Sequence, residues 1–214
     1  MYCLIYSQTL KTGDKMNELI MIPWLIDKTQ FKGIRKQEIL KAKYFQKGDK
    51  TIVFDFLGYS HSLSILEAFK NKGKEFSKII FFGAASFMGD FKTGDIVFPK
   101  SNFIFLRYED RVSNTIETDK NISTYIKKHF TNISADSMTI DYAGYFPTKE
   151  LSMLKKYSTL FIEMEYGFIL RWVIKEDINL IPIYILTDKW GEKPVINDNI
   201  KDPFNNTLKI ILEA

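Results

Sequence analysis

The sequence is poor in the two residues that most often close disulfides and hold metals: it has one cysteine and two histidines in 214 residues. With Cys3 alone, no disulfide can form within the chain, which favours a reducing compartment. His61 and His129 have no cysteine or histidine partners at the spacing of a metal site, so we predict no bound metal. We expect the protein to be cytoplasmic.

Long apolar runs and nucleotide-binding glycine motifs are also missing. No stretch approaches the ~18 uninterrupted apolar residues of a membrane span, and the first residues lack the basic region of a signal peptide. The sequence contains neither G-x-x-x-x-G-K-[ST] nor G-x-G-x-x-G. Nucleotide hydrolysis on a P-loop and hydride transfer are therefore unsupported, and we expect no organic cofactor.

The charge and composition are those of a folded globular protein. The formal net charge is +4, and the lysines are scattered along the chain. Scattered lysines are typical of a solvated surface, so we expect neither a nucleic-acid partner nor a membrane partner. Hydrophobic residues make up 45% of the chain and aromatic residues 15%, which is enough for a large core. We predict a single domain over residues 1–214.

Apolar runs alternate with segments whose apolar residues recur at helical spacing, which indicates an α/β protein. Segment 78–83 is apolar without alternation, as in a central strand covered on both faces. Segment 17–26 fits either a strand or a buried helix. The other expected strands are 51–58, 94–99, 137–146, 159–164 and 178–188; the expected helices are 60–73 with Gly73 as its cap, 121–130, 148–157, 165–177 and 203–214.

Acidic side chains stand at the ends of two expected strands. Glu163 and Glu165 flank Met164 where a strand becomes a helix, and Asp188 ends the next strand. Ligands of open α/β sheets bind outside the carboxyl ends of the strands. Taken singly, Glu165 fits a helix cap and Asp188 a surface turn. Two such positions at neighbouring strand ends favour a functional site.

Three small residues, Gly83, Ala84 and Ala85, end the expected central strand. Small residues at a strand end let a ligand approach the backbone, and they also make turns. The pattern alone leaves both interpretations open.

Four segments resemble the purine nucleoside phosphorylase / methylthioadenosine nucleosidase superfamily, in the order that the family has them. "FDFLGYSHSLS" stands at the family's first strand-to-helix turn, and "IIFFGAASFMGDFKTGDIVFP" resembles its glycine-ended strand and the K-x-G-D-I-V strand that follows. "YAGYFPTKE" resembles its base-stacking loop. "FIEMEYGFILRWVIKEDINLIPIYILTDKW" resembles its E-M-E element, followed by a strand that ends in Ser-Asp.

The resemblance implies a single-domain, three-layer α/β/α fold with a central mixed sheet. It also implies cleavage of the N-ribosyl bond of a purine nucleoside or a 5′-modified purine nucleoside, by hydrolysis or phosphorolysis. Inorganic phosphate is a possible co-substrate. Members of the superfamily form homo-oligomers, so we expect one here.

By the same resemblance, Glu165 would accept hydrogen bonds from the ribose hydroxyls and Asp188 would protonate or hydrogen-bond the purine at N7. Met164 would pack on the sugar, and Tyr145 would stack on the base. The expected substrate site is completed by Glu163, Gly83, Ala84, Ala85 and Thr187.

The phosphate and water side of the site departs from the family pattern. Phe81 and Ala84 stand where phosphorolytic members have an arginine and a serine or threonine. The first loop offers Gln8 and no acid before Asp14, although hydrolytic members use a glutamate there. Ser86 replaces a glycine. Three hypotheses remain open: an enzyme with an altered nucleophile site, a homologue that binds a nucleoside without turnover as a sensor or regulator, and an unrelated α/β protein.

Overall fold

One mixed sheet forms the centre of the computed structural model, which describes residues 17–26, 28–106, 111–117, 128–130, 134–140, 160–192 and 197–213. Within these ranges the strands are β1 (Glu18–Ile22), β2 (Gln37–Ile39), β3 (Ala42–Lys47), β4 (Lys50–Phe54), β5 (Lys78–Met88), β6 (Ile96–Leu106), β7 (Arg111–Glu117), β8 (Ser134–Ile140), β9 (Leu160–Glu163) and β10 (Asn179–Lys189). The longer helices of the described part are α1 (Tyr59–Asn71), α4 (Tyr166–Glu176) and α5 (Asp198–Glu213), and a 3-10 turn, η1, spans Lys28–Phe31.

Strand β5 is the hub of the sheet. It pairs in parallel with β1 on one side and with β10 on the other, and β1 pairs in parallel with β4. The end of β5, from Ser86 to Met88, pairs antiparallel with β9. Because β10 pairs with β6, β6 with β8 and β8 with β9, these strands and β5 close into a ring. The carboxyl ends of β1, β4, β5 and β10 therefore meet beside the end of β9.

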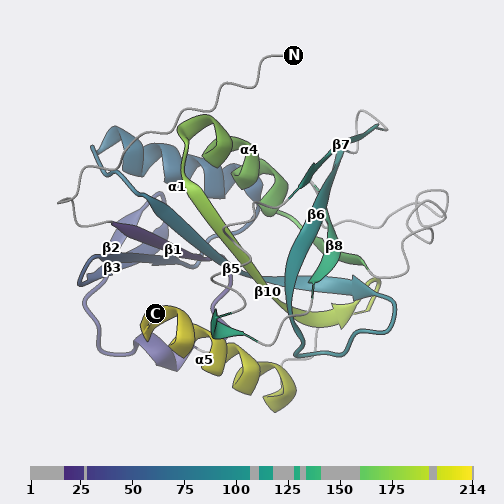
Figure 1. Ribbon diagram of the computed structural model, residues 1–214. Helices are drawn as coiled ribbons and strands as arrows, with labels where there is room; N and C mark the ends of the chain where they lie inside the picture. Colours follow the sequence, from purple (N-terminus) through teal and green to yellow (C-terminus); the bar gives the residue numbers. More distant parts are fainter. Residues whose placement is uncertain are drawn as a thin grey trace.

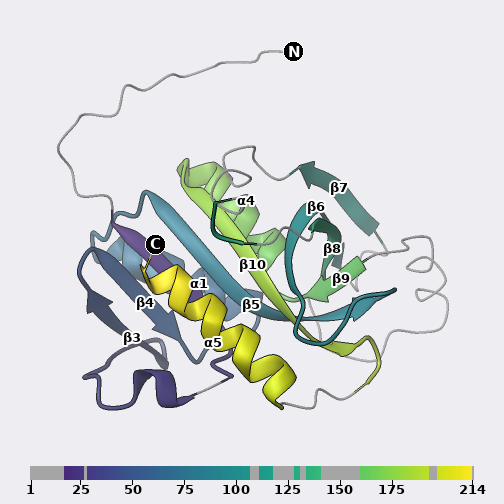
Figure 2. The same cartoon turned by 60° about the horizontal axis from the view of Figure 1, so that its bottom comes forward.

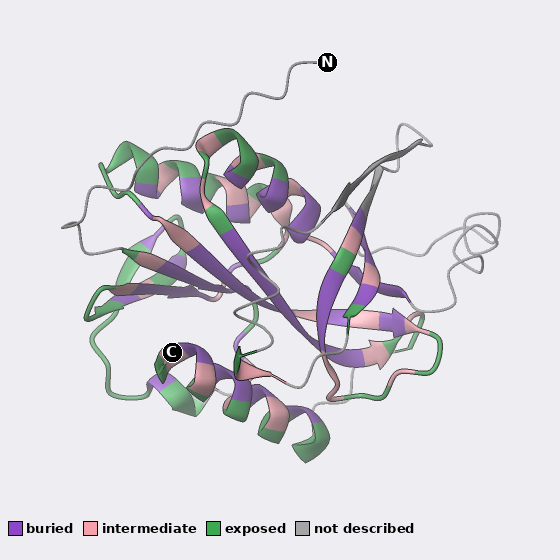
Figure 3. Cartoon of the chain, in the orientation of Figure 1, coloured by how far each residue is buried: buried purple, intermediate pink, exposed green. Residues whose placement is uncertain are grey.

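Helices cover both faces of this sheet. Helices α1 and α4 lie side by side on one face, and α5 crosses the other face (Figures 1 and 2). Phe69 and Ile169 belong to the core under α1 and α4, and Phe204 and Leu208 belong to the core under α5. Figure 3 shows buried residues on the side of each helix that faces the sheet and exposed residues on its outer side. The predicted three-layer α/β/α architecture is confirmed.

The strands resolve one open alternative and correct three predicted ends. Strand β4 ends at Phe54 rather than at Gly58. Segment 17–26 contains the strand β1, which pairs with β4 and β5, so it is not a helix. Strand β5 does not end at Gly83 but runs on to Met88, because β10 and then β9 supply backbone partners beyond the glycine. Strand β6 continues past Pro99, where a shift in its register with β8 accommodates a residue that has no N–H.

The helix ends are partly as predicted. Gly73, at φ +68, follows the last turn of α1. Its N–H donates to the carbonyl of Lys70, and the N–H of Lys74 donates to that of Phe69, which is the Schellman pattern. Helix α5 begins at Asp198 rather than at Pro203, so that boundary was wrong. Helix 148–157 and most of helix 121–130 lie outside the described residues. Within the described part, the helices are too short or too polar to cross a membrane.

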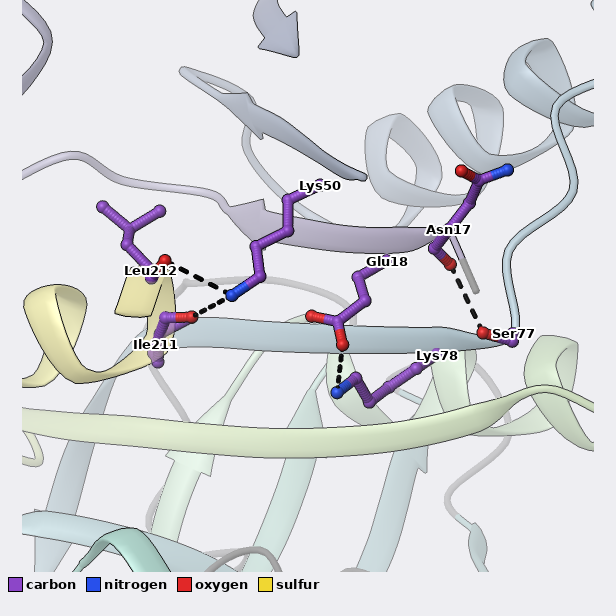
Figure 4. Close-up of polar contacts among 7 residues, drawn as sticks. All are labelled: Asn17, Glu18, Lys50, Ser77, Lys78, Ile211 and Leu212. Atoms are coloured by element: carbon purple, nitrogen blue, oxygen red, sulfur yellow. Dashed lines mark hydrogen bonds and ion pairs between the residues drawn. The ribbon is translucent and has the colours of Figure 1, made fainter. Parts of the chain in front are cut away.

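Polar contacts fix the edge of the sheet opposite the strand ends described above. The Nζ atom of Lys50 lies 3.4 Å from the carbonyl oxygen of Ile211 and 3.3 Å from that of Leu212, at the C-terminal end of α5 (Figure 4). Lys78 forms an ion pair with Glu18, its cross-strand neighbour. A cation at the carbonyl end of a helix is stabilising, so Lys50 helps to hold α5 against the sheet.

Candidate active site

A cavity of about 190 Å³ opens where the carboxyl ends of the central strands meet β9. Three of its residues are acidic: Glu163, Glu165 and Asp188. Backbone pairing brings their strands together, because β9 and β10 both pair with β5. The remaining lining residues are Pro23, Trp24, Leu57, Ala84, Ala85, Ser86, Ile140, Ile162, Met164, Thr187 and Trp190.

Glu163 is buried and serves the start of helix α4. Its Oε2 accepts hydrogen bonds from the backbone N–H groups of Glu165 at 2.7 Å and Tyr166 at 2.6 Å, and from the Tyr184 hydroxyl at 3.3 Å. Its Oε1 accepts from the Thr139 hydroxyl. Burial raises the pKa of Glu163 to about 7, although these donors act in the opposite direction. With both oxygens engaged, Glu163 has a structural role at this turn.

A buried polar network supports Glu163 from strands β6 and β8. The Thr139 hydroxyl accepts hydrogen bonds from the Asn102 amide at 2.9 Å and from the N–H of Gly167 at 2.8 Å. Asn102 also donates to Ser137 at 2.8 Å. The Thr139 hydroxyl can donate to Glu163 or, at 3.3 Å, to Oδ1 of Asn102, and the contact with Glu163 is the shorter one. The network fixes the position of Glu163 and, through it, the turn that carries Met164 and Glu165.

Glu165 lies in the same turn and is only 5% exposed. Its Oε1 accepts a hydrogen bond from the N–H of Gly58 at 3.0 Å, and its Oε2 lies 3.3 Å from the N–H of Met164. Burial, and then repulsion by Glu163, raise the pKa of Glu165 to about 8. Gly58 has φ +76 and ψ 163, a conformation that favours glycine and turns its N–H toward the carboxyl group. Glu165 has fewer donors than Glu163, so it can accept more from a ligand.

Asp188 receives one hydroxyl on each carboxylate oxygen. Ser86 donates to Oδ2 at 2.7 Å, and Thr187 donates to Oδ1 at 2.5 Å. The β5–β10 register shifts between Leu186 and Asp188, so Thr187 is an extra residue in β10 and Asp188 lies opposite Ser86. A bulge of this kind redirects side chains near functional sites. Here it lets Thr187 and Asp188, which are consecutive in a strand, both line the cavity.

The small residues of β5 divide between the cavity and the core. Ala84 and Ala85 line the cavity, but Gly83 does not. A Cβ atom on Gly83 would lie 2.8 Å from the Tyr184 ring and 2.9 Å from the Phe81 ring, so the glycine makes room for these aromatic side chains. Phe81 is fully buried in the core under α1 and α4. The structure therefore places Phe81 away from the cavity.

One further predicted residue, Tyr145, lies outside the described residues.

The sequence interpretation missed the apolar wall. Trp190 packs with Met164 on the cluster formed by Met138, Ile140, Leu160 and Ile162. Trp24 and Leu57, which follow β1 and β4, are 39% and 69% exposed. Trp190 follows the end of β10 at Lys189, so its closeness in sequence to Asp188 is the one signal for its place. For Trp24 and Leu57 the sequence gives no comparable signal.

A larger cavity, of about 510 Å³, lies between the C-terminal ends of α1 and α4. None of the predicted site residues line it. Its charged residues include Lys70 and Glu176, which pair with each other at 2.6 Å. Size alone favours this cavity, but the smaller one holds the three buried or partly buried carboxyl groups. We therefore assign the candidate site to the smaller cavity.

The described residues contain no group of histidine, cysteine, aspartate and glutamate side chains that could hold a metal ion. A scan against protein-family models and a search of curated proteins find no match. Solved structures do match. The 5′-methylthioadenosine/S-adenosylhomocysteine nucleosidase of Campylobacter jejuni has a TM-score of 0.69 at 16% identity, over 94% of this chain and 100% of that chain.

Two other enzymes have the same architecture. The purine nucleoside phosphorylase of Toxoplasma gondii, in complex with immucillin-H, has a TM-score of 0.71 at 16% identity, over 92% of this chain and 89% of that chain. The futalosine hydrolase of Helicobacter pylori has a TM-score of 0.66 at 14% identity, over 93% and 98%. This chain has the nucleoside phosphorylase fold. The fold predicted from the four sequence segments is thereby confirmed.

Proposed function

We propose that the protein cleaves the N-ribosyl bond of a purine nucleoside or a 5′-modified purine nucleoside. The observation that carries this proposal is that Glu165, Met164 and Asp188 line one cavity at the strand ends of a nucleoside phosphorylase fold. In an unrelated α/β protein, we would not expect these three side chains to line the same cavity. The structural neighbours include two hydrolytic enzymes and one phosphorolytic enzyme.

In this proposal Glu165 binds the ribose. The two ribose hydroxyls each donate a hydrogen bond to the Glu165 carboxylate, and these bonds are strong because the acceptor is charged. Breaking the bond between C1′ and the base leaves positive charge on the sugar, and a carboxylate beside the ribose stabilises that charge. Met164, next in the chain and also in the cavity wall, packs on the sugar.

Asp188 acts on the base. The electron pair of the broken bond moves onto the purine, and the Asp188 carboxyl group gives its proton to N7. Water adds to C1′, and the proton that this water loses restores the carboxyl group. Asp188 lies at the end of β10, and Ala84 and Ala85 form the adjacent floor. Their small side chains let a planar base lie close to the backbone of β5. Thr187 contacts Asp188 directly, so its place in the site is beside the base.

The exposed apolar residues of the cavity fit the 5′ end of the substrate. Trp24 and Leu57 present large apolar surfaces at the ends of β1 and β4. A 5′ substituent of low polarity gains about 25 cal/mol per Å² when such surfaces remove it from water. This favours a 5′-modified nucleoside over one with a free hydroxyl.

Hydrolysis fits the site better than phosphorolysis. The described residues that line the cavity include three carboxyl groups and no lysine, arginine or histidine. A phosphate dianion needs cationic or N–H donors, and the described side chains of this cavity supply no cation. A water molecule is neutral and does not need a cationic ligand. Inorganic phosphate is thus dispensable in this proposal.

Release of free base tests the proposed function. The protein is incubated with inosine, adenosine, methylthioadenosine and futalosine, each with and without phosphate, and free base is followed by chromatography. We expect base release from at least one nucleoside without phosphate, and a large fall in its rate in Asp188→Asn. Release that requires phosphate would make the protein a phosphorylase. Thermal stabilisation by a nucleoside with no release would support the sensor alternative and contradict the enzymatic proposal.

A further inference from the structure

Ser86 makes a contact that the catalytic proposal has not used. Its hydroxyl donates to Oδ2 of Asp188 at 2.7 Å, across the β5–β10 pair. Both residues are partly buried, and both line the cavity. The contact exists because the extra residue Thr187 brings Asp188, instead of Thr187, opposite Ser86. A serine at this point of β5 is therefore matched to the bulge in β10.

The hydroxyl groups of Thr187 and Ser86, which both contact Asp188, are not equivalent. The Thr187 hydroxyl lies 2.5 Å from Oδ1 of Asp188 and 3.3 Å from the carbonyl oxygen of Ala85, so it has two acceptors. It can turn to Ala85 whenever Asp188 needs no donor. Ser86 bonds to Asp188 from the neighbouring strand, where backbone pairing on both sides holds it in place. Ser86 is thus the fixed contact, and Thr187 the adjustable one.

We propose that Ser86 is a positioning residue for Asp188: it fixes one carboxylate oxygen so that the other edge of the carboxyl group meets the base. This inference rests on the proposed function. Without Ser86, the Asp188 side chain keeps only the hydroxyl of its own chain neighbour and can rotate away from the base. The expected loss lies in the chemical step, because Glu165 and the apolar wall still bind the substrate.

The test compares Ser86→Ala, Ser86→Thr and the matched control Ser64→Ala. Ser64 lies on α1, is exposed and donates to the carbonyl of Ser60, so the control removes a serine hydroxyl away from the cavity. Initial rates of base release are measured with the nucleoside that the wild-type protein cleaves best. We expect kcat to fall about ten-fold or more in Ser86→Ala with KM within about two-fold, as loss of a hydrogen bond to a charged group implies.

Ser86→Thr keeps a hydroxyl and should retain kcat within about three-fold, and Ser64→Ala should match the wild type. A double-mutant cycle separates positioning from a general structural effect. In the Asp188→Asn background, Ser86→Ala should cause no further loss of the residual rate. An equal fold loss in both backgrounds, or wild-type kcat in Ser86→Ala, would overturn the inference.

Failure of the proposed function looks different. In that case the wild-type protein itself releases no base from any nucleoside, and the positioning role falls with it. If the wild type is active and only the Ser86 variants behave unexpectedly, the function stands and the role of Ser86 is wrong.

Discussion

Two glutamates that are two residues apart differ in how far their carboxyl oxygens are already engaged by hydrogen bonds. Glu163 receives donors on both oxygens from α4, Thr139 and Tyr184, which leaves little capacity for a ligand. Glu165 receives the Gly58 N–H and one longer contact. The prediction of Glu163 as a substrate ligand came from its place in the E-M-E segment. Its contacts in the fold fit better with a structural role, in which Glu163 supports the turn that carries Glu165.

Glu165 predicts a pH-dependent affinity for ribose. Burial and repulsion by Glu163 raise the pKa of Glu165 to about 8, so the carboxyl group of the free protein is protonated at neutral pH. Accepting two hydroxyl donors requires the ionised form, so binding releases a proton. In an Asp188→Asn background, where turnover is slow compared with the binding measurement, we expect purine nucleoside affinity to rise between pH 6 and about 8.

Calorimetry in two buffers of different ionisation enthalpy measures that proton directly. Adding Glu165→Gln should weaken binding and remove the pH dependence. A 2′,3′-dideoxynucleoside, which lacks both ribose hydroxyls, should bind to the parent protein without proton release and without pH dependence. Equal affinity and an equal pH profile with and without Glu165 would mean that the ribose lies elsewhere.

At the scale of elements, the turn between β9 and α4 depends on Glu163. Helix α4 has no side-chain cap from Glu165, the residue that precedes it. Glu163 instead accepts the first free N–H groups, at Glu165 and Tyr166. The strand that ends at Glu163 and the helix that starts at Tyr166 are therefore joined by one buried carboxylate.

Loss of this carboxylate should destabilise the protein. We expect Glu163→Ala to lower the free energy of unfolding by about 3 kcal/mol, because several buried N–H and hydroxyl donors lose their shared carboxyl acceptor. Urea denaturation measures the change, and hydrogen exchange at the Tyr166 amide should accelerate. Glu192→Ala, at an exposed glutamate, is the control and should stay within about 0.5 kcal/mol of the wild type. A change in Glu163→Ala no larger than in the control would exclude the capping role.

The sequence predicted elements where local pattern decides them and failed where pairing across the fold decides. The ends of α4 and β10 and the Gly73 cap follow from apolar spacing and from residues near each helix end. The length of β5 does not, since β9 and β10 extend it past Gly83. The Ser86–Asp188 contact depends on a bulge at Thr187 that no local motif announces.

At the scale of the whole molecule, the closed part of the sheet explains why the site has three carboxyl groups in a small volume. Strand β5 carries Ala84, Ala85 and Ser86, β10 carries Thr187 and Asp188, and β9 leads into Glu165. The burial of Glu163 and Glu165 opposes their ionisation. At the same pH, the two carboxyl groups therefore retain protons in the folded protein that they release in the unfolded chain.

This proton uptake predicts that stability falls as pH rises. Between the ordinary carboxyl pKa of 4.5 and the folded-state pKa of about 8, Glu165 is protonated in the folded protein and ionised in the unfolded chain. Raising the pH then favours unfolding, by up to about 1.4 kcal/mol per pH unit. Urea denaturation at pH 5, 6, 7 and 8 should show a shallower decline in Glu165→Gln than in the wild type. Parallel curves for the two proteins would contradict the raised pKa.

The central claim is that one cavity binds the ribose at Glu165 and the base at Asp188. A crystal structure of the wild-type protein with a purine C-nucleoside, whose carbon–carbon bond it cannot cleave, tests this most directly. We predict ribose hydroxyls within hydrogen-bond distance of the Glu165 carboxylate, Met164 against the sugar, and the purine N7 edge facing Asp188. A nucleoside bound outside this cavity, or bound with its ribose away from Glu165, would contradict the account.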